Sequence, residues 1–240
     1  MPVGSRAAES RRLATGRAAG RSHRLMRRAA KLALFVAALV PAAYLVWGAS
    51  AEALGANPIE AITDETGIWT LRFLLITLLV TPLRRLTGWN ALAGYRRMLG
   101  LFAFFYGTLH FLTWAWLDQF FALDEMAADV IKRPFITVGF AAFALMVPLA
   151  ITSTAGWIRR LGRRWQMLHR LVYVSAALGV VHYWWLVKAD ISRPMRYAWV
   201  LGLLMAVRLV AARRRSQAAA RRGAPDAAHA ARQARRPAGG

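Results

Sequence analysis

Long uncharged apolar segments alternate with short charged segments along this chain of 240 residues. A helix that rises about 1.5 Å per residue needs about 20 apolar residues to cross a bilayer. Six segments approach that length and composition, and they lie at residues 32–51, 68–83, 98–117, 134–158, 164–188 and 195–212. The pattern therefore predicts an all-α integral membrane protein, a bundle of six transmembrane helices.

The two ends of the chain differ from this apolar middle. Residues 1–30 are rich in Arg, Ala, Gly and Ser, and residues 213–240 are rich in Arg and Ala. Such compositions bury too little apolar surface to hold a fold. We therefore expect a disordered basic tail at 1–30, one membrane domain at 31–212 and a second disordered basic tail at 213–240.

The charges fall on opposite sides of the predicted bundle. With the N-terminus inside, the cytoplasmic segments hold 27 of the 33 Lys and Arg residues, and the outer loops hold nine of the 11 Asp and Glu residues. An excess of Lys and Arg marks the cytoplasmic side of a multi-pass membrane protein. Both termini are therefore expected in the cytoplasm, with short acidic loops outside.

Composition also limits the possible chemistry. The formal net charge is +22, but the charges stand in blocks between apolar segments, which does not fit a basic nucleic-acid-binding surface. The chain has no cysteine, which excludes disulfides, iron–sulfur clusters, thiolate-ligated heme and covalently attached c-type heme. A bound redox metal would have to be held by histidine.

Two histidines lie inside predicted membrane helices. His110 and His182 each stand 12 residues after the cytoplasmic start of an outward-running helix, about 18 Å along its axis. Each also follows a glycine by three residues, Gly107 and Gly179, and that position lies on the same helix face. A glycine there leaves room for a flat macrocycle against the backbone.

A lone histidine in a membrane helix is about as often a hydrogen-bonding residue between helices as a metal ligand, and such glycines also occur where helices pack closely. Two histidines at matched depth, in spans without Asp or Glu, favour a different interpretation. We predict that His110 and His182 are the two axial ligands of one heme, in the outer half of the membrane.

His169 precedes His182 by 13 residues, about 20 Å along a continuous helix. No second membrane-level histidine stands opposite it, because His23 and His229 lie in the tails. His169 is a candidate ligand of a second heme iron with a non-histidine partner. Other roles are a hydrogen bond to a heme propionate, part of a flavin or quinone site, or an interfacial side chain without a ligand.

Arg96 stands 14 residues before His110, near the cytoplasmic end of the same predicted helix. A second stacked heme would need its ligand at this position, and arginine does not ligate iron. Arg96 is therefore a candidate for binding a propionate or a phosphate. As one of the cytoplasmic basic residues, it needs no such role to explain it.

Three stretches carry a resemblance to a known family, and it extends over about residues 31–212. They are TPLRRLTGW at 81–89, RRMLGLFAFFYGTLHFLTW at 96–114 and RRWQMLHRLVYVSAALGVVHYWW at 163–185. With one histidine on the third span and two on the fifth, the chain resembles the ferric-reductase-like transmembrane domain. Within that family it most resembles the heme-binding membrane subunits of bacterial periplasmic methionine sulfoxide reductase systems.

The resemblance implies a multi-pass protein of the bacterial inner membrane with b-type heme held by His110, His169 and His182. It also implies FMN on the cytoplasmic side and delivery of electrons to a soluble periplasmic molybdopterin reductase that repairs oxidised envelope proteins. Larger relatives hold two histidine pairs and a fused flavin and nicotinamide domain. Arg96 departs from that pattern, which argues against a second bis-histidine heme.

The sequence predicts a relay rather than a complete enzyme. No strand, glycine-rich turn and helix follow residue 212 to bind a nicotinamide nucleotide, and the outer loops are too short for a molybdenum site. The quinone pool or a cytoplasmic flavin reductase would supply electrons. A stand-alone cytochrome b-type metalloreductase or quinone-linked oxidoreductase is the alternative, whereas a transporter would normally need acids buried in its spans.

Overall fold

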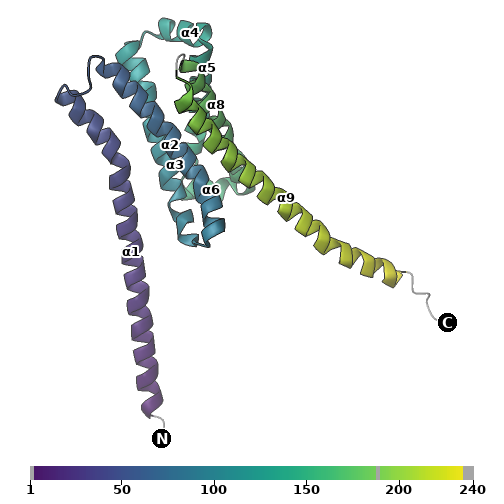
Figure 1. Cartoon of the computed structure of the whole chain (residues 1–240). Helices are drawn as coiled ribbons and strands as arrows, with labels where there is room; N and C mark the ends of the chain where they lie inside the picture. Colours follow the sequence, from purple (N-terminus) through teal and green to yellow (C-terminus); the bar gives the residue numbers. More distant parts are fainter. Residues whose placement is uncertain (1–2, 188–189, 235–240) are drawn as a thin grey trace.

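The computed structural model describes residues 3–187 and 190–234, with side chains described at 25–187 and 190–218. The described secondary structure is helical throughout (Figure 1). The elements are α1 (Val3–Ser50), α2 (Pro58–Thr87), the 3-10 helix η1 (Asn90–Gly94), α3 (Arg96–Leu112), the π-helix η2 (Thr113–Asp118), α4 (Leu123–Lys132), α5 (Pro134–Ile151), α6 (Ala155–Leu161), α7 (Arg163–Leu168), α8 (Leu171–Leu186) and α9 (Ser192–Ala234).

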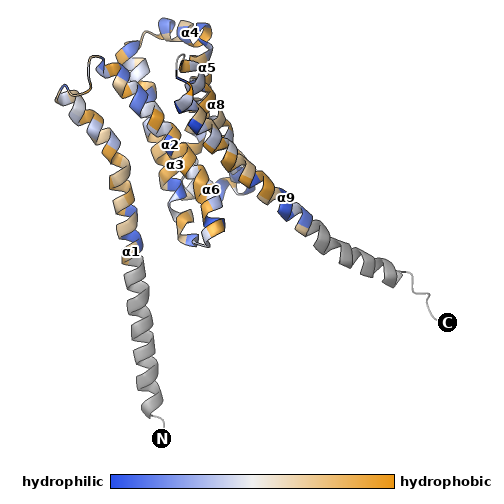
Figure 2. Cartoon of the chain, viewed as in Figure 1, coloured by the Kyte–Doolittle hydropathy of each residue, from blue (hydrophilic) through white to orange (hydrophobic). Residues whose placement is uncertain are grey.

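Within the described residues, five helices are long and apolar enough to cross a membrane, namely Leu25–Ser50, Pro58–Thr87, Arg96–Asp118, Pro134–Ile151 and Ser192–Ala218. The remaining predicted span contains α8, whose 16 residues are about 24 Å long. Figure 2 shows apolar residues along the middle of these helices and hydrophilic residues gathered in α4. Six crossings and cytoplasmic termini stay predictions.

The tails also stay predictions. Helix α1 begins at Val3 and α9 ends at Ala234, so both helices reach into the segments that the sequence predicts to be disordered. The side chains of residues 1–24 and 219–240 lie outside the described part of the chain, as do residues 1–2 and 235–240 altogether.

Helix α2 begins ten residues earlier than the apolar pattern predicts. The Asn57 side chain accepts a hydrogen bond from the Glu60 amide at 3.2 Å, and Pro58 occupies the first helical position. Gly88, in the left-handed conformation, ends the helix, and its amide donates to the Arg84 carbonyl. Asp64 therefore lies on α2 and not in the preceding outer loop.

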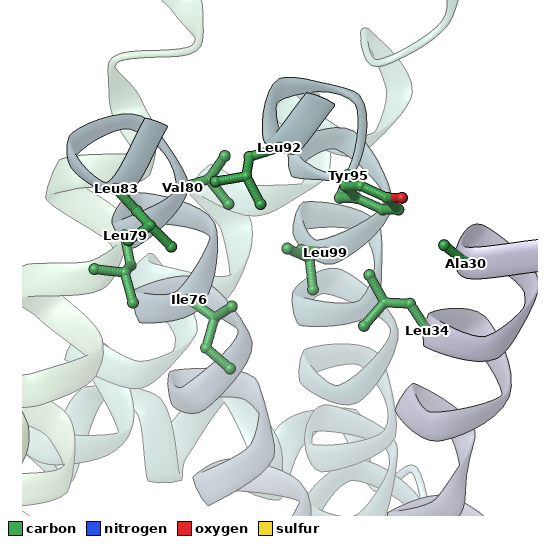
Figure 3. Close-up of a pocket in the computed structure, with 9 residues that line it drawn as sticks. All are labelled: Ala30, Leu34, Ile76, Leu79, Val80, Leu83, Leu92, Tyr95 and Leu99. Carbon is green, nitrogen blue, oxygen red and sulfur yellow. The ribbon is translucent and has the colours of Figure 1, made fainter. Parts of the chain in front are cut away.

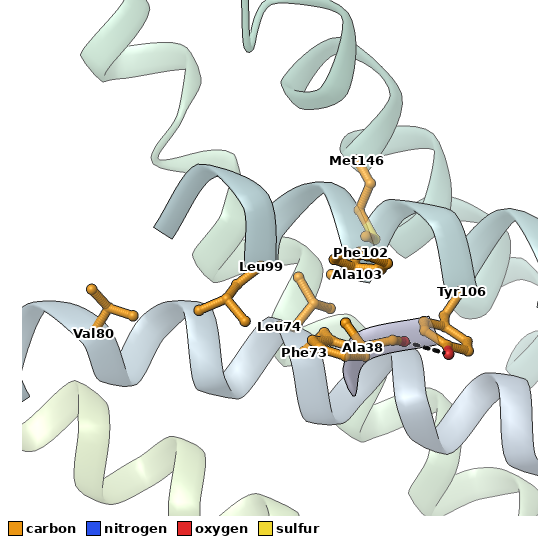
Figure 4. Close-up of a cluster of buried hydrophobic side chains, with 9 residues drawn as sticks. All are labelled: Ala38, Phe73, Leu74, Val80, Leu99, Phe102, Ala103, Tyr106 and Met146. Carbon is orange, nitrogen blue, oxygen red and sulfur yellow. Dashed lines mark hydrogen bonds between the residues drawn. The ribbon is translucent and has the colours of Figure 1, made fainter. Parts of the chain in front are cut away.

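Four helices form the centre of the bundle. Helix α2 packs along α3, α5 packs along α8, and α3 joins the two pairs through contacts with α5. Figure 4 shows the main cluster of buried apolar side chains, from Ala38 of α1 to Met146 of α5. A second cluster joins α2, α8 and α9 through Leu78, Ala176 and Leu204.

One buried tyrosine of this centre, Tyr106, is hydrogen-bonded to helix α1. The Tyr106 hydroxyl donates to the Ala38 carbonyl at 2.8 Å and accepts from the Ala42 amide at 3.1 Å (Figure 4). These two backbone groups are the partners of one helical turn, and Pro41 lies between them. The hydroxyl therefore bridges α1 beside its proline, where a helix ladder is weakened.

An apolar cavity of about 310 Å³ separates α1 from α2 and α3 near the end where Arg96 lies (Figure 3). Leu92 and Tyr95 lie at one end of it, and Leu34 of α1 lies at its side. Its full lining is Ala30, Leu34, Ile76, Leu79, Val80, Leu83, Leu92, Tyr95 and Leu99.

Candidate heme site

His110 and His182 meet between the two helix pairs. His110 lies near the C-terminal end of α3, and His182 lies near the C-terminal end of α8. Their ring centroids are 6.1 Å apart and their ring planes are inclined by 75°. The sequence predicts matched depth on two helices, and the structure brings the two rings together in an edge-to-face arrangement.

Each imidazole is oriented by a backbone carbonyl of the neighbouring helix. His110 Nδ1 lies 2.9 Å from the Thr63 carbonyl oxygen of α2, and His182 Nδ1 lies 2.7 Å from the Phe135 carbonyl oxygen of α5. A carbonyl only accepts, so each Nδ1 carries the proton and donates it. The lone pair of each ring is thereby left on Nε2, the arrangement of a metal-ligating histidine with an outer hydrogen bond.

The pair has the dimensions of two axial heme ligands. A metal–imidazole bond of about 2 Å, and about 1 Å more to the ring centre, places two axial imidazole centroids roughly 6 Å apart across one metal. Within the described residues, no group of three His, Asp or Glu side chains could hold a bare metal ion. Two histidines suit an iron whose other ligands come from a porphyrin.

The glycines closest to the rings are not the ones that the sequence points to. A Cβ at Gly139 of α5 would lie 2.6 Å from His182 Nδ1, and a Cβ at Gly67 of α2 would lie 3.0 Å from His110 Cε1. Gly107 packs instead against Thr70 and Phe143, at ordinary contact distances. A Cβ at Gly179 would similarly meet only Leu71, at 3.6 Å.

Gly67 and Gly139 therefore belong to the site, and reasoning along single helices does not find them. The i−3 spacing relates residues of one helix, whereas each of these glycines faces a histidine of a different helix. The sequence does hold one signal, because the 72 residues that separate Gly67 from Gly139 also separate His110 from His182.

His169 does not lie on the same helix as His182. Helix α7 ends at Leu168, His169 and Arg170 form a turn, and α8 begins at Leu171. The prediction of one continuous helix through both histidines is therefore wrong, because the helix is interrupted between them. His169 is placed at the opposite end of α8 from His182.

The His169 ring packs against Trp165, one turn earlier in the chain. It stacks on the Trp165 indole with 3.9 Å between ring centroids, and its Nδ1 lies 3.2 Å from the Trp165 carbonyl oxygen. Its Nε2 is buried and has no hydrogen-bond partner among the described residues. Burial lowers the pKa of His169, and the positive charge of Arg96 lowers it further. Because Nδ1 donates to the Trp165 carbonyl, Nε2 is left as an acceptor or a ligand.

Arg96 begins α3 and is half-buried, whereas the next residue, Arg97, is exposed. Its charge acts on His169, so the structure brings these two predicted site residues into one neighbourhood at the end of the bundle opposite the histidine pair. The four residues singled out by the sequence thus form two groups, His110 with His182 and His169 with Arg96.

Trp114 has a buried indole nitrogen that, like His169 Nε2, lacks a partner among the described residues. The residue lies one turn after His110, within the π-helical segment η2. Such segments and such unsatisfied groups are both frequent at functional sites.

Comparisons with known proteins identify the family of the chain. Residues 66–180 match the model of the family described as ferric reductase like transmembrane component. Curated relatives named protein-methionine-sulfoxide reductase heme-binding subunit MsrQ are 58% identical in Herminiimonas arsenicoxydans, over 75% of this chain and 84% of the relative, and 57% identical in Azospira oryzae, over 76% and 79%. A third, from Ralstonia nicotianae, is 55% identical over 76% of this chain and 85% of its own length. The chain is a membrane protein that belongs to the MsrQ family.

Proposed function

We propose that this chain is the b-type heme electron-transfer subunit of a protein-methionine-sulfoxide reductase system. The observation that carries the proposal is the pair of imidazoles, His110 and His182, whose centroids are 6.1 Å apart and whose Nε2 lone pairs are both left available. The names of the relatives, which call them heme-binding subunits, support it.

In this proposal, His110 and His182 would hold one heme through their Nε2 atoms. A bis-histidine heme supplies a one-electron carrier that alternates between ferric and ferrous iron. The Thr63 and Phe135 carbonyls fix the orientation of the two imidazoles, so both rings are preorganised to hold the group. The surrounding helices exclude water through stacked side chains such as Phe111 and Phe143, 5.1 Å apart.

The proposed orientation has six membrane crossings, both termini in the cytoplasm and the histidine pair toward the periplasm of the bacterial inner membrane. The acids near that end, among them Asp118, Asp124 and Glu125, would then face the periplasm. We propose that they help to dock a soluble molybdopterin reductase of the MsrP type, which receives the electrons and reduces methionine sulfoxide. The chain itself would carry out no substrate chemistry.

The other end of the bundle would receive the electrons. His169 offers an unpartnered buried Nε2, and the half-buried Arg96 beside it offers a positive charge. These residues could hold an FMN phosphate, a heme propionate or a second heme iron with a non-histidine partner. The apolar cavity between α1, α2 and α3 opens at this end and suits the isoprenoid chain of a quinol (Figure 3). The donor would be quinol or a cytoplasmic flavin reductase.

One alternative uses the same histidine pair. A stand-alone cytochrome b-type metalloreductase, or a quinone-linked oxidoreductase, would pass electrons directly to a small acceptor at the outer face. The family match to ferric-reductase-like proteins over residues 66–180 favours it as the second candidate.

A reoxidation experiment separates the two functions. The purified protein is reconstituted in vesicles and reduced anaerobically, and the optical heme signal is followed after adding the periplasmic reductase and a methionine-sulfoxide peptide. The proposed function requires rapid reoxidation only when both are present. Reoxidation by ferric chelates alone, with no response to the reductase, would establish the alternative, and a protein without heme would refute both.

A further inference from the structure

The two candidate ligands are held in the same way. Each imidazole lies in a seat formed by one backbone carbonyl and one glycine of a neighbouring helix. Each imidazole reaches a carbonyl 47 residues before it in the sequence, Thr63 for His110 and Phe135 for His182. In both helices a glycine stands four residues after that carbonyl, at Gly67 and Gly139. Carbonyl, glycine and histidine therefore recur with one spacing in both helix pairs.

The glycine has a physical role at that position. In an α-helix each Cβ leans toward the N-terminus, so the side chain at i+4 lies beside the carbonyl at i. A residue with a Cβ would cover that carbonyl on the side from which the imidazole approaches. Glycine leaves the carbonyl accessible to a second donor besides its own helical amide.

The clearance differs between the two seats. At Gly139 a Cβ would come within 2.6 Å of His182 Nδ1 and 2.7 Å of Cε1, which no real Cβ contact tolerates. At Gly67 the distances to His110 are 3.0 Å to Cε1 and 3.1 Å to Nδ1, so the ring would have to move by a few tenths of an ångström. His182 is thus the more tightly seated ring.

We propose that Gly67 and Gly139 are positioning residues that fix the rotation of the two imidazoles and so hold their planes 75° apart. This inference rests on the proposed axial ligation. The angle between axial ring planes controls the anisotropy of a low-spin ferric heme, and nearly perpendicular planes give a signal with an unusually large maximal g value. The glycines would therefore set a spectroscopic property of the heme.

The alternative is that these glycines only allow helices to pack, as small residues do in membranes. The contact atoms argue against it, because at both positions the nearest atoms belong to the imidazole. At Gly100 of α3, by contrast, a Cβ would meet only a Thr77 methyl group at 3.7 Å, and at Gly202 of α9 it would meet nothing within 4 Å.

The test compares four alanine variants of the full-length protein in detergent. Gly139→Ala and Gly67→Ala alter the seats, and Gly100→Ala and Gly202→Ala are the matched controls. The readouts are the heme-to-protein ratio, the elution profile and the electron paramagnetic resonance spectrum of the oxidised protein. The resonance spectrum would not respond to a role in packing alone.

We expect Gly139→Ala to convert most of the low-spin signal to high spin or to lose heme while eluting normally. Gly67→Ala should stay low-spin with a shifted maximal g value, and both controls should match the wild type. If Gly139→Ala does not fold, the g shift in Gly67→Ala decides. Spectra of either folded seat variant that superimpose on the wild type would overturn the inference while leaving the proposed function intact. A wild type without low-spin heme would overturn both.

Discussion

The Trp165 indole stacks on the His169 imidazole with 3.9 Å between ring centroids, and this contact leaves His169 Nε2 buried and unpartnered within the described residues. A buried polar atom without a partner is unfavourable by about 1–3 kcal/mol. A cofactor that bonds to this nitrogen would remove that cost. Trp114 Nε1 and Arg208 Nε are also buried without a partner among the described residues, but only the His169 nitrogen can ligate a metal, so His169 marks a candidate second binding position.

We predict that His169→Ala loses one cofactor and keeps the other. His169 lies at the opposite end of α8 from His182, so its removal should leave the low-spin heme signal intact. The flavin-to-protein or heme-to-protein ratio of the purified protein should fall to about half or less. Trp165→Phe keeps a ring against the imidazole and is the control. Unchanged flavin and heme ratios in His169→Ala would contradict the assignment.

Tyr106→Phe should loosen α1 without disturbing the histidine pair. The change removes the hydroxyl that bridges Ala38 and Ala42, inside a fully buried environment. We expect the free energy of unfolding in detergent to fall by about 1–3 kcal/mol, with faster proteolysis after Ser50. Tyr44→Phe, at a side chain that is 54% exposed, should change neither. An unaltered unfolding curve for Tyr106→Phe would show that the bridge is unimportant.

Arg208→Leu should weaken the attachment of α9. Two branches of this half-buried guanidinium donate to the Tyr173 hydroxyl of α8 and to the Leu78 carbonyl of α2. Losing both bonds should lower the free energy of unfolding by roughly 1–3 kcal/mol. Arg208→Lys should recover only part of this, because one ammonium lacks the forked geometry. The exposed Arg213→Leu is the control, and equal melting temperatures for all four proteins would refute the prediction.

The sequence predicts the histidine pair because the rise per residue of a helix and the positions of its basic residues together give the depth of each histidine in the membrane. His110 and His182 stand at equal distances from basic helix starts, and such counting survives folding when the helices run in the same direction. The family is equally visible, because its motifs lie within continuous stretches, and the comparisons confirm it.

The sequence alone does not predict which residues of different helices come into contact. Gly107 and Gly179 share a face with the histidines, yet the rings lie against Gly67 and Gly139 of other helices. The break at His169 depends on local backbone bonds such as the Arg170 amide to the Met167 carbonyl, which hydropathy does not report. The effect of the Arg96 charge on His169 is likewise not visible in the sequence, because the two residues lie 73 positions apart.

The central claim is that His110 and His182 ligate one iron from opposite sides, and the most direct measurement is the reduced-minus-oxidised optical spectrum of the purified wild type, His110→Ala and His182→Ala. We predict a low-spin b-type spectrum in the wild type that either substitution abolishes or converts to high spin. A low-spin spectrum of wild-type intensity in both variants would show that the heme is held elsewhere and would contradict the account.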